Sequence, residues 1–268
     1  MSVTLWDSHV HSYNSFDGSH SIEQICSQAF KNGMSGITIT DHCDVGIYLT
    51  DDWQQRLENS ISETAFASAN WAGKLDVSLG IELGQPIHDK QLSEKIIKSA
   101  NFDLIIGAIH NLDGMEDFYF IKKDKCSDIK NLLEKYFEEQ LEIVKNCDID
   151  VLAHITYAYR YLGRSGSVPP VQAFEEQLRL IFSEIANREI AIELNTSGIY
   201  RGDGISLPDL WELKLFHDCG GEYVTLASDA HKAQDVGKGF DKGADLLLQA
   251  GFKYYSHFKQ RKPVQIKL

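Results

Sequence analysis

Short β-rich runs alternate with longer runs of helical periodicity along this chain of 268 residues, and this alternation constrains the fold more than any other feature. The expected strands are Val3–Ser8, Gly36–Thr40, Asp76–Glu82, Leu104–His110, Asp150–His154, Ala191–Asn195 and Tyr223–Ser228. The expected helices are Ile22–Asn32, Asp52–Gly73, Lys90–Ala100, Ile129–Asn146, Val171–Arg188, Leu207–Cys219 and Gly243–Gly251, the last of which precedes a short strand, Phe252–Tyr255. Each crossover returns the chain in the same direction, so the pattern predicts a parallel sheet.

Histidines recur at the ends of the predicted strands. Six of the ten in the chain occupy such positions: His9, His11, His42, His110, His154 and His231. The carboxyl ends of barrel strands converge on one mouth, whereas an open doubly wound sheet gathers functional groups at one switch point. Polar groups after nearly every strand therefore favour a closed or nearly closed α/β barrel.

Composition narrows the functional classes. No Pro/Gly/Ser-rich linker divides the chain, so we expect one domain over residues 1–268. No run approaches the roughly 18 apolar residues that span a bilayer, and the N-terminus lacks the basic and apolar segments of an export signal. We expect a cytoplasmic protein with no membrane partner. Five scattered cysteines without CxxC spacing are typical of reduced thiols.

The charge balance points to a small substrate. The chain carries 26 basic and 39 acidic residues, a net charge of −13. Such a field repels polyanions, and nucleic-acid binding relies on Lys and Arg to neutralise phosphates. We therefore expect no nucleic-acid partner, and bound cations would offset part of the acidic charge.

The strand-end residues predict a metal centre. His9 and His11 are two apart on an extended strand, so both face one side and form a chelating pair. Glu82 and Asp229 lie at the same depth, where buried carboxylates are costly unless they are paired or metal-bound. Six histidines with two carboxylates exceed the needs of one tetrahedral site. Two or three divalent ions are implied, and mixed nitrogen and oxygen ligands suit Zn, Mn or Fe.

In order along the chain, these residues resemble the polymerase and histidinol phosphatase (PHP) family. The likeness rests on His9-x-His11, Asp41-His42, Glu82, the single histidines His110 and His154, and Asp229-x-His231. The resemblance covers nearly the whole chain and implies a distorted (β/α)7 TIM-like barrel with the metal site at the C-terminal ends of the strands.

The resemblance also implies three ligand sets. His9 and His11 with Glu82 and Asp229 would hold one metal, and Glu82 with His110 and His154 a second. The third set would be Asp17, His42 and His231, where many family members have a histidine in place of Asp17.

Within the family, the chain is similar to the stand-alone histidinol-phosphate phosphatases. Three segments carry this likeness: Ser15-Phe16-Asp17-Gly18, Gly80-Ile81-Glu82-Leu83-Gly84 and Glu193-Leu194-Asn195-Thr196-Ser197-Gly198. The implied activity is hydrolysis of L-histidinol phosphate to L-histidinol and phosphate, in histidine biosynthesis.

Substrate-binding candidates follow the later strands. Arg160 is our first choice for phosphate recognition, before Arg201, with Arg164 nearby, because a guanidinium can bind phosphate through two N–H groups. Asp17, His42 or a metal-bound water could protonate the leaving alkoxide. Glu116 and Asp117 could meet a cationic group of the substrate, although a solvated acidic loop is the commoner explanation.

Three other functions remain open from the sequence. The chain could be a PHP phosphoesterase acting on nucleotides or oligonucleotide ends, or a non-catalytic metal-binding regulatory domain. A metal-dependent amidohydrolase shares the HxH start, but the bridging lysine usual after a middle strand is missing here. The oligomeric state is open as well.

Overall fold

The computed structural model describes residues 5–50, 52–121, 128–163 and 168–268. Its strands are β1 (Trp6–Val10), β2 (Gly36–Ile39), β3 (His42–Asp44), β4 (Asp76–Gly84), β5 (Leu104–Ala108), β6 (Val151–Leu152), β7 (Ala191–Asn195), β8 (Val224–Ala227), β9 (Tyr254–Lys259) and β10 (Lys262–Lys267). They form one sheet in the order β1-β2-β4-β5-β6-β7-β8-β9-β10, and β3 pairs with β4 beside this path. Neighbouring strands are parallel except for the antiparallel pair β9–β10. The predicted α/β class with a mostly parallel sheet is confirmed.

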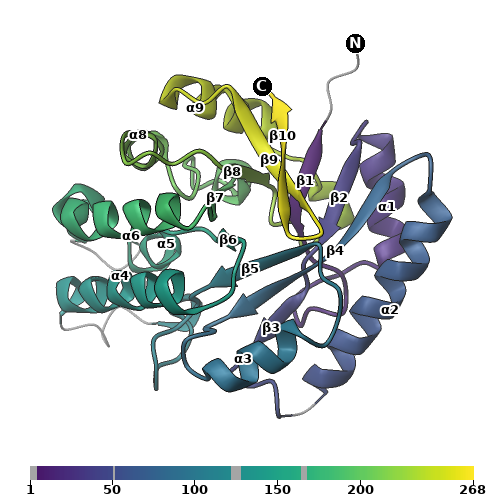
Figure 1. Ribbon diagram of the computed structural model, residues 1–268, viewed down its shortest axis with the longest axis horizontal. Helices are drawn as coiled ribbons and strands as arrows, with labels where there is room; N and C mark the ends of the chain where they lie inside the picture. Colours follow the sequence, from purple (N-terminus) through teal and green to yellow (C-terminus); the bar gives the residue numbers. More distant parts are fainter. Residues whose placement is uncertain (1–4, 51, 122–127, 164–167) are drawn as a thin grey trace.

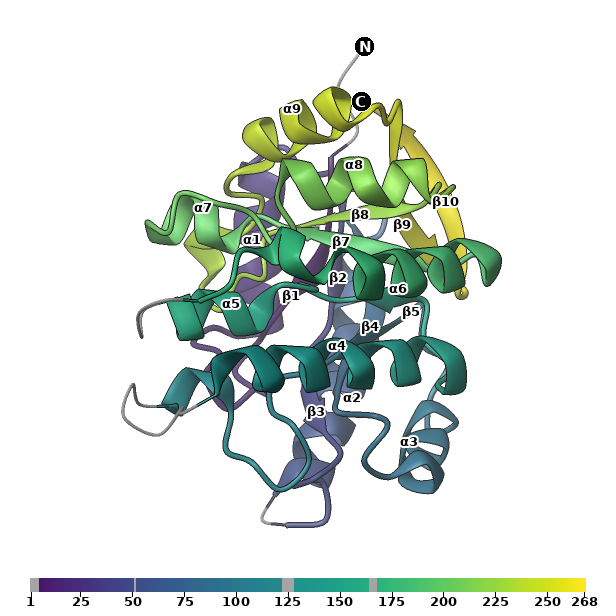
Figure 2. The ribbon, with the colours of Figure 1, turned by 90° about the vertical axis from the view of Figure 1, so that its left-hand side faces the viewer.

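The longer helices lie around the outer side of the curved sheet (Figures 1 and 2). The α-helices are α1 (Ile22–Lys31), α2 (Trp53–Trp71), α3 (Lys90–Ile97), α4 (Ile129–Asn146), α5 (Tyr157–Leu162), α6 (Glu175–Asn187), α7 (Ser197–Arg201), α8 (Leu210–Asp218) and α9 (Phe240–Ala250). Short 3₁₀ turns are η1 (Phe118–Phe120), η4 (Val171–Phe174) and η5 (Ala233–Asp235). The Ser21 side chain and Gln24 form the capping box that starts α1. Within the described ranges, none of the helices has the length and apolar content to cross a membrane.

Burial on both faces explains the apolar character of the central strands. Every residue of β1, β5 and β7 is buried, as expected for parallel strands that are covered on both sides. A separate apolar cluster joins β5, β6, β7 and β9, and its buried members are Leu104, Ile106, Ala108, Val151, Ala153, Ala191 and Phe258.

The path of the sheet is not closed, so it does not confirm the predicted distorted barrel. A parallel bridge joins Val10, the last residue of β1, to Ala230, which lies beyond the end of β8. Earlier along these strands, β9 pairs with β8 at Thr225, and the Tyr255 hydroxyl of β9 accepts a hydrogen bond from the Trp6 backbone N–H. Strand β9 therefore occupies the place where β8 would otherwise pair with β1, and the sheet path stays open.

Several predicted boundaries differ from the structure. The first strand begins at Trp6 and runs to Val10, and Val3 lies outside the described residues. Strand β3 was not predicted, and the tail led by Pro263 forms β10. Proline is tolerated there because β10 is an edge strand and needs fewer ladder hydrogen bonds.

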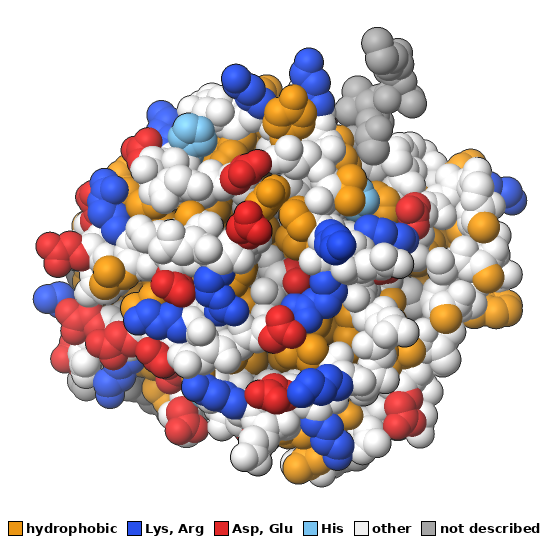
Figure 3. Space-filling view, viewed as in Figure 1, with side chains coloured by type: hydrophobic (Ala, Val, Ile, Leu, Met, Phe, Trp, Pro, Cys, Tyr) orange, Lys and Arg blue, Asp and Glu red, His pale blue; other side chains and the backbone are white. Residues whose placement is uncertain are grey.

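The turn between β9 and β10 is anchored to the rest of the sheet. Gln260 and Arg261 adopt positive φ angles of 50° and 61°, as the two-residue turns of β-hairpins require. Both backbone N–H groups donate to Asp103, and the Arg261 guanidinium pairs with Asp148 and the buried Asp150. The hairpin face is shown in Figure 3, where acidic and basic side chains are interspersed.

His257 on β9 makes folding stability depend on pH. Its ring stacks on Trp6 at 3.8 Å between ring centroids, and burial lowers its pKa below the usual 6.5. In the unfolded chain this side chain is protonated below about pH 6.5. In the folded chain it becomes protonated only at a lower pH. We expect this contribution to stability to be complete above pH 6.5 and to be lost as the pH falls towards the lowered folded-state pKa.

The His257→Phe variant, which keeps an aromatic ring on Trp6, should lose less stability between pH 7.5 and pH 5.5 than the wild type does. Urea unfolding at both pH values measures the difference. An identical pH dependence in the two proteins would contradict this role of His257.

Candidate metal centre

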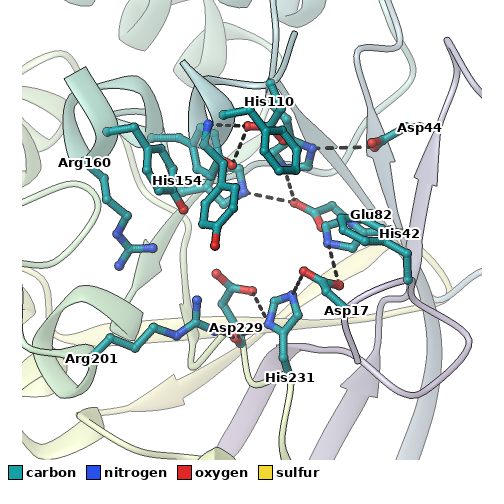
Figure 4. Close-up of a pocket in the computed structure, with 16 residues that line it drawn as sticks. Asp17, His42, Asp44, Glu82, His110, His154, Arg160, Arg201, Asp229 and His231 are labelled. Carbon is teal, nitrogen blue, oxygen red and sulfur yellow. Dashed lines mark hydrogen bonds and ion pairs between the residues drawn. The ribbon is translucent and has the colours of Figure 1, made fainter. Parts of the chain in front are cut away.

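The carboxyl ends of the parallel strands meet around a cavity of about 250 Å³. Its lining residues are Phe16, Asp17, His42, Asp44, Glu82, His110, Asp117, Tyr119, Phe120, His154, Tyr157, Arg160, Tyr161, Arg201, Asp229 and His231 (Figure 4). His9 and His11 are fully buried and contact Glu82 of this lining. The structure therefore brings together all nine residues that the sequence predicts as metal ligands.

Glu82 on β4 is the centre of this cluster. Its side chain is 1% exposed, and five imidazoles lie around it. Oε1 is 2.9 Å from His154 Nε2 and 3.2 Å from His110 Nε2. Oε2 is 2.7 Å from His42 Nδ1. His42 is the first residue of β3 and lies opposite Glu82 where β3 pairs with β4. One carboxylate thus faces imidazole nitrogens on both of its oxygens.

The HxH pair lies on one side of Glu82. The Nε2 atoms of His9 and His11 are 2.9 Å apart, and Glu82 Oε2 is 3.3 Å from the first and 3.6 Å from the second. Asp229 Oδ1 is 3.3 Å from His11 Nε2. Four potential ligand atoms therefore converge here.

A third group lies nearer to the solvent. His231 Nε2 is 3.0 Å from Asp17 Oδ2, and His42 Nε2 is 3.6 Å from Asp17 Oδ1. The rings of His42 and His231 both lie beside that of His11, and ligand atoms of these three histidines lie within 4.8 Å of one another. Two further groups with this spacing are His9-His11-Glu82 and His42-Glu82-His110.

The residues fit divalent cations because the cluster stabilises positive charge. Burial alone would lower the pKa of His42, yet the negative charges of Glu82, Asp17 and Asp44 raise it to about 9. Burial likewise opposes the shift of Glu82, but positive charge on neighbouring imidazoles lowers the Glu82 pKa well below its usual range. Coordinated cations would supply this positive charge.

Two buried polar atoms without hydrogen bonds also indicate that the cluster fits metal ions. His42 Nδ1 and Glu82 Oε2 are both buried and lie 2.7 Å apart, yet neither atom makes a hydrogen bond. Buried polar atoms without partners are costly, and metal coordination would satisfy both. The backbone at the site is also strained, since His154 and Asp229 have positive φ angles of 23° and 53°.

The candidate phosphate-binding arginines both line the cavity and lie on the same side of it in Figure 4, away from Asp17 and His42. Arg160 of α5 is buried, and it donates to Asp203 Oδ2 at 2.9 Å and to Ser197 Oγ at 3.0 Å. Arg201 of α7 donates to the backbone oxygen of Asp229 at 2.8 Å. Arg164 lies outside the described residues.

Of the two acidic residues that we expected to meet a cationic group of the substrate, one lines the cavity and the other does not. Glu116 is exposed and is not part of the cavity lining, whereas Asp117 lines the cavity and accepts a hydrogen bond from the Tyr157 hydroxyl at 3.0 Å. Contact between Glu116 and a substrate stays a prediction.

Sequence reasoning assigned no role to three polar residues beside the cluster. Asp44 is 3.5 Å from His110 Nδ1, Glu193 contacts His9, and Asn195 contacts Asp229. The two-residue period of strands could have indicated them, because Asp44 follows His42 on the same face of β3, and Glu193 and Asn195 share a face of β7.

Fold and site together define a class: α/β proteins with a candidate metal centre at the carboxyl ends of parallel strands. The chain belongs to the PHP domain family, whose model matches residues 7–197. It is 26% identical to the "Probable histidinol-phosphatase" of Thermotoga maritima, over 98% of this chain and 99% of that one. It is 28% identical to the protein of the same name from Clostridium acetobutylicum, over 93% and 95% of the two chains.

A solved structure has the same fold. The histidinol phosphate phosphatase of Lactococcus lactis, in complex with zinc, L-histidinol and phosphate, superimposes with a TM-score of 0.86 at 24% identity. The match covers 98% of this chain and 100% of that one.

Replacing Glu82 by Gln tests the centre directly. The variant loses the charge that faces the imidazoles, so zinc affinity should fall at least about 10-fold, since even outer partners of ligands contribute that much. Competition with a chromophoric chelator measures the affinity. Glu212→Gln is the matched control, because Glu212 is also a buried glutamate but lies on α8, outside the cluster. Equal zinc affinity in both variants would contradict the assignment.

Proposed function

We propose that this protein is a metal-dependent phosphatase that hydrolyses L-histidinol phosphate to L-histidinol and phosphate, a step of histidine biosynthesis. The observation that carries the proposal is the strand-end cluster of six histidines and three carboxylates, with two arginines lining the same cavity. Relatives of matching length named for this activity support it, as does the Lactococcus lactis structure with L-histidinol and phosphate.

We propose two or three divalent ions, Zn, Mn or Fe, as cofactors. His9, His11, Glu82 and Asp229 would hold one, Glu82, His110 and His154 a second, and Asp17, His42 and His231 a third. Bound cations of this kind neutralise phosphoryl charge and lower the pKa of a coordinated water towards neutrality.

The arginines would bind the phosphate of the substrate. Asp203 and Ser197 hold the Arg160 side chain in place, so a guanidinium with a set orientation lines the cavity. Arg201 lies next to Asp229 and His231 and brings a second positive charge to the same cavity. Preorganised donors of this kind stabilise charge that develops in a phosphoryl-transfer transition state.

The proton for the leaving alkoxide has two candidates on this chain. Burial would raise the pKa of Asp17, but its hydrogen bond to His231 and the charge of His42 lower it instead. Asp17 is therefore ionised at neutral pH and suits a ligand better than a proton donor. His42, whose Nε2 faces Asp17, remains the other candidate.

The alcohol end of the substrate would lie among aromatic rings. Phe16, Tyr119, Tyr157 and Tyr161 line the cavity together with Asp117. A carboxylate beside aromatic rings suits the ammonium and imidazole groups of histidinol. We propose Asp117, in preference to Glu116, as the acid that meets them.

The proposed phosphatase activity extends to the domain organisation, the location and the partner of the protein. We propose one PHP-type domain over residues 1–268, a distorted barrel that β9 interrupts, acting in the cytoplasm on a small phosphorylated substrate and not on nucleic acid. The net charge of −13 supports the last point, because it opposes the approach of a polyanion.

A substrate comparison tests the activity. The metal-loaded protein should release inorganic phosphate from L-histidinol phosphate with a kcat/KM at least about 100-fold above that for nucleoside monophosphates, because the site recognises the alcohol through polar contacts. Chelator treatment should abolish release, and added Zn²⁺, Mn²⁺ or Fe²⁺ should restore it. Preference for a nucleotide or a 5′-phosphorylated oligonucleotide would favour the alternative phosphoesterase.

An Arg160→Lys variant distinguishes the oriented guanidinium group of Arg160 from its positive charge. Arg160→Lys keeps the positive charge but loses the planar fork that Asp203 and Ser197 orient, so kcat/KM should fall about 10- to 100-fold, a cost of about 1.4–2.7 kcal/mol. A fall in kcat would indicate a transition-state contact, and a rise in KM alone would indicate binding only. Arg179→Lys, an exposed arginine of α6 paired with Glu175, is the control and should leave both constants unchanged.

A further inference from the structure

The Glu193 carboxylate lies on the Nδ1 side of the HxH pair. It is buried on β7, and its Oε1 is 2.5 Å from His9 Nδ1. Its Oε2 accepts hydrogen bonds from the His154 backbone N–H at 2.9 Å and from Asn195 Nδ2 at 3.2 Å. The Glu193 side chain thus contacts two candidate ligands, the imidazole of His9 and the backbone N–H of His154.

The direction of these hydrogen bonds follows from Asn195. The Asn195 Oδ1 atom accepts from the Ser197 backbone N–H at 2.9 Å, so the amide NH₂ must point the other way, towards Glu193 and Asp229. Glu193 Oε2 therefore meets two N–H donors. With Glu193 as the acceptor on both oxygens, the hydrogen bond to His9 requires a proton on His9 Nδ1.

A similar argument applies to His11 through Ser15. The Ser15 hydroxyl donates to Asp41 Oδ1 at 2.8 Å and accepts from the His42 backbone N–H at 3.1 Å. His11 Nδ1 lies 3.0 Å from the same oxygen. A hydroxyl has one proton to donate, and here Asp41 receives it.

Asp41 is an acceptor throughout. Besides Ser15, it receives the Ser12 backbone N–H at 2.6 Å, the Ser12 hydroxyl at 2.8 Å and the Ser60 hydroxyl at 2.6 Å. With the Ser15 proton directed at Asp41, the contact between Ser15 and His11 must be a hydrogen bond donated by His11 Nδ1.

We propose that Glu193 and the Ser15–Asp41 pair are positioning residues that hold His9 and His11 as Nδ1–H tautomers, so that both Nε2 lone pairs face the metal centre. The Nε2 atoms are 2.9 Å apart, and two lone pairs at that distance repel each other unless a cation lies beside them. Glu82 Oε2 lies within 3.6 Å of both Nε2 atoms, and Asp229 Oδ1 lies 3.3 Å from His11 Nε2. This inference rests on the proposed metal centre and extends it by naming the ring nitrogens that bind.

A carboxylate is needed at position 193, because both of its oxygens must accept. A glutamine there has one oxygen, so its NH₂ group would face either His9 Nδ1–H or the His154 N–H. Either arrangement sets donor against donor, which turns the His9 ring or shifts the β6 end. Glu193→Gln should therefore weaken zinc binding about 10- to 100-fold. Glu212→Gln again serves as the control for a buried glutamate that contacts none of the proposed ligands.

Ser15 has a closely matched control in Ser60. Both hydroxyls are buried and donate to the Asp41 carboxylate, but only Ser15 contacts a histidine ring. Ser15→Ala should weaken zinc binding about 10-fold or more, whereas Ser60→Ala should keep the wild-type affinity. Chelator competition, starting from the zinc-loaded protein, measures all four variants.

Two-bond ¹H–¹⁵N spectra of the zinc-loaded wild type give a readout that does not depend on activity. His9 and His11 should show a protonated Nδ1 and a zinc-bound Nε2, and Ser15→Ala should broaden or shift the His11 Nδ1 signal alone. Zinc on Nδ1 of either ring, or zinc affinities of Glu193→Gln and Ser15→Ala equal to those of their controls, would overturn the proposal. A wild type that binds no zinc would overturn the metal centre itself, and this inference with it.

Discussion

The structure depends on the burial of one carboxylate among imidazoles. Glu82 is withdrawn from water on β4, and such a charge is stable only where positive charge or hydrogen-bond donors surround it. His42, His110 and His154 approach its two oxygens from three different strand ends. The sheet must curve enough to bring these strand ends together. The buried charge of Glu82 is therefore stable only in a fold with this curvature.

A second layer of polar residues supports that arrangement. Glu193 contacts His9 and Asn195 contacts Asp229 directly, whereas Asp41 acts on His11 through the Ser15 hydroxyl. Such outer partners orient metal ligands and tune their basicity. Arg160 joins this layer through Ser197, which in turn donates to Asn195. The phosphate-binding side of the cavity and the metal-binding side therefore share one hydrogen-bond network.

Particular residues show where sequence reasoning succeeds. His9 and His11 could be paired from their two-residue spacing, and Glu82 and Asp229 from their place after β-rich runs. The structure places them in contact, as predicted. That the sheet path stays open could not be predicted, because β9 pairs with β8 and contacts β1 through Tyr255 and Ser256, which carry no local signal. Likewise, Glu116 and Asp117 look equivalent in the chain, and only Asp117 lines the cavity.

The sequence by itself determined the α/β class, the strand ends that carry polar groups and the chemical types of those groups, because hydrophobic periodicity and residue identity are local properties. Only the tertiary structure decided which ring nitrogen faces which oxygen, that Glu193 contacts His9 across 184 positions of the chain, and that the sheet path stays open. These outcomes depend on distances between segments far apart in the chain, and such distances are set by packing and not by any local pattern.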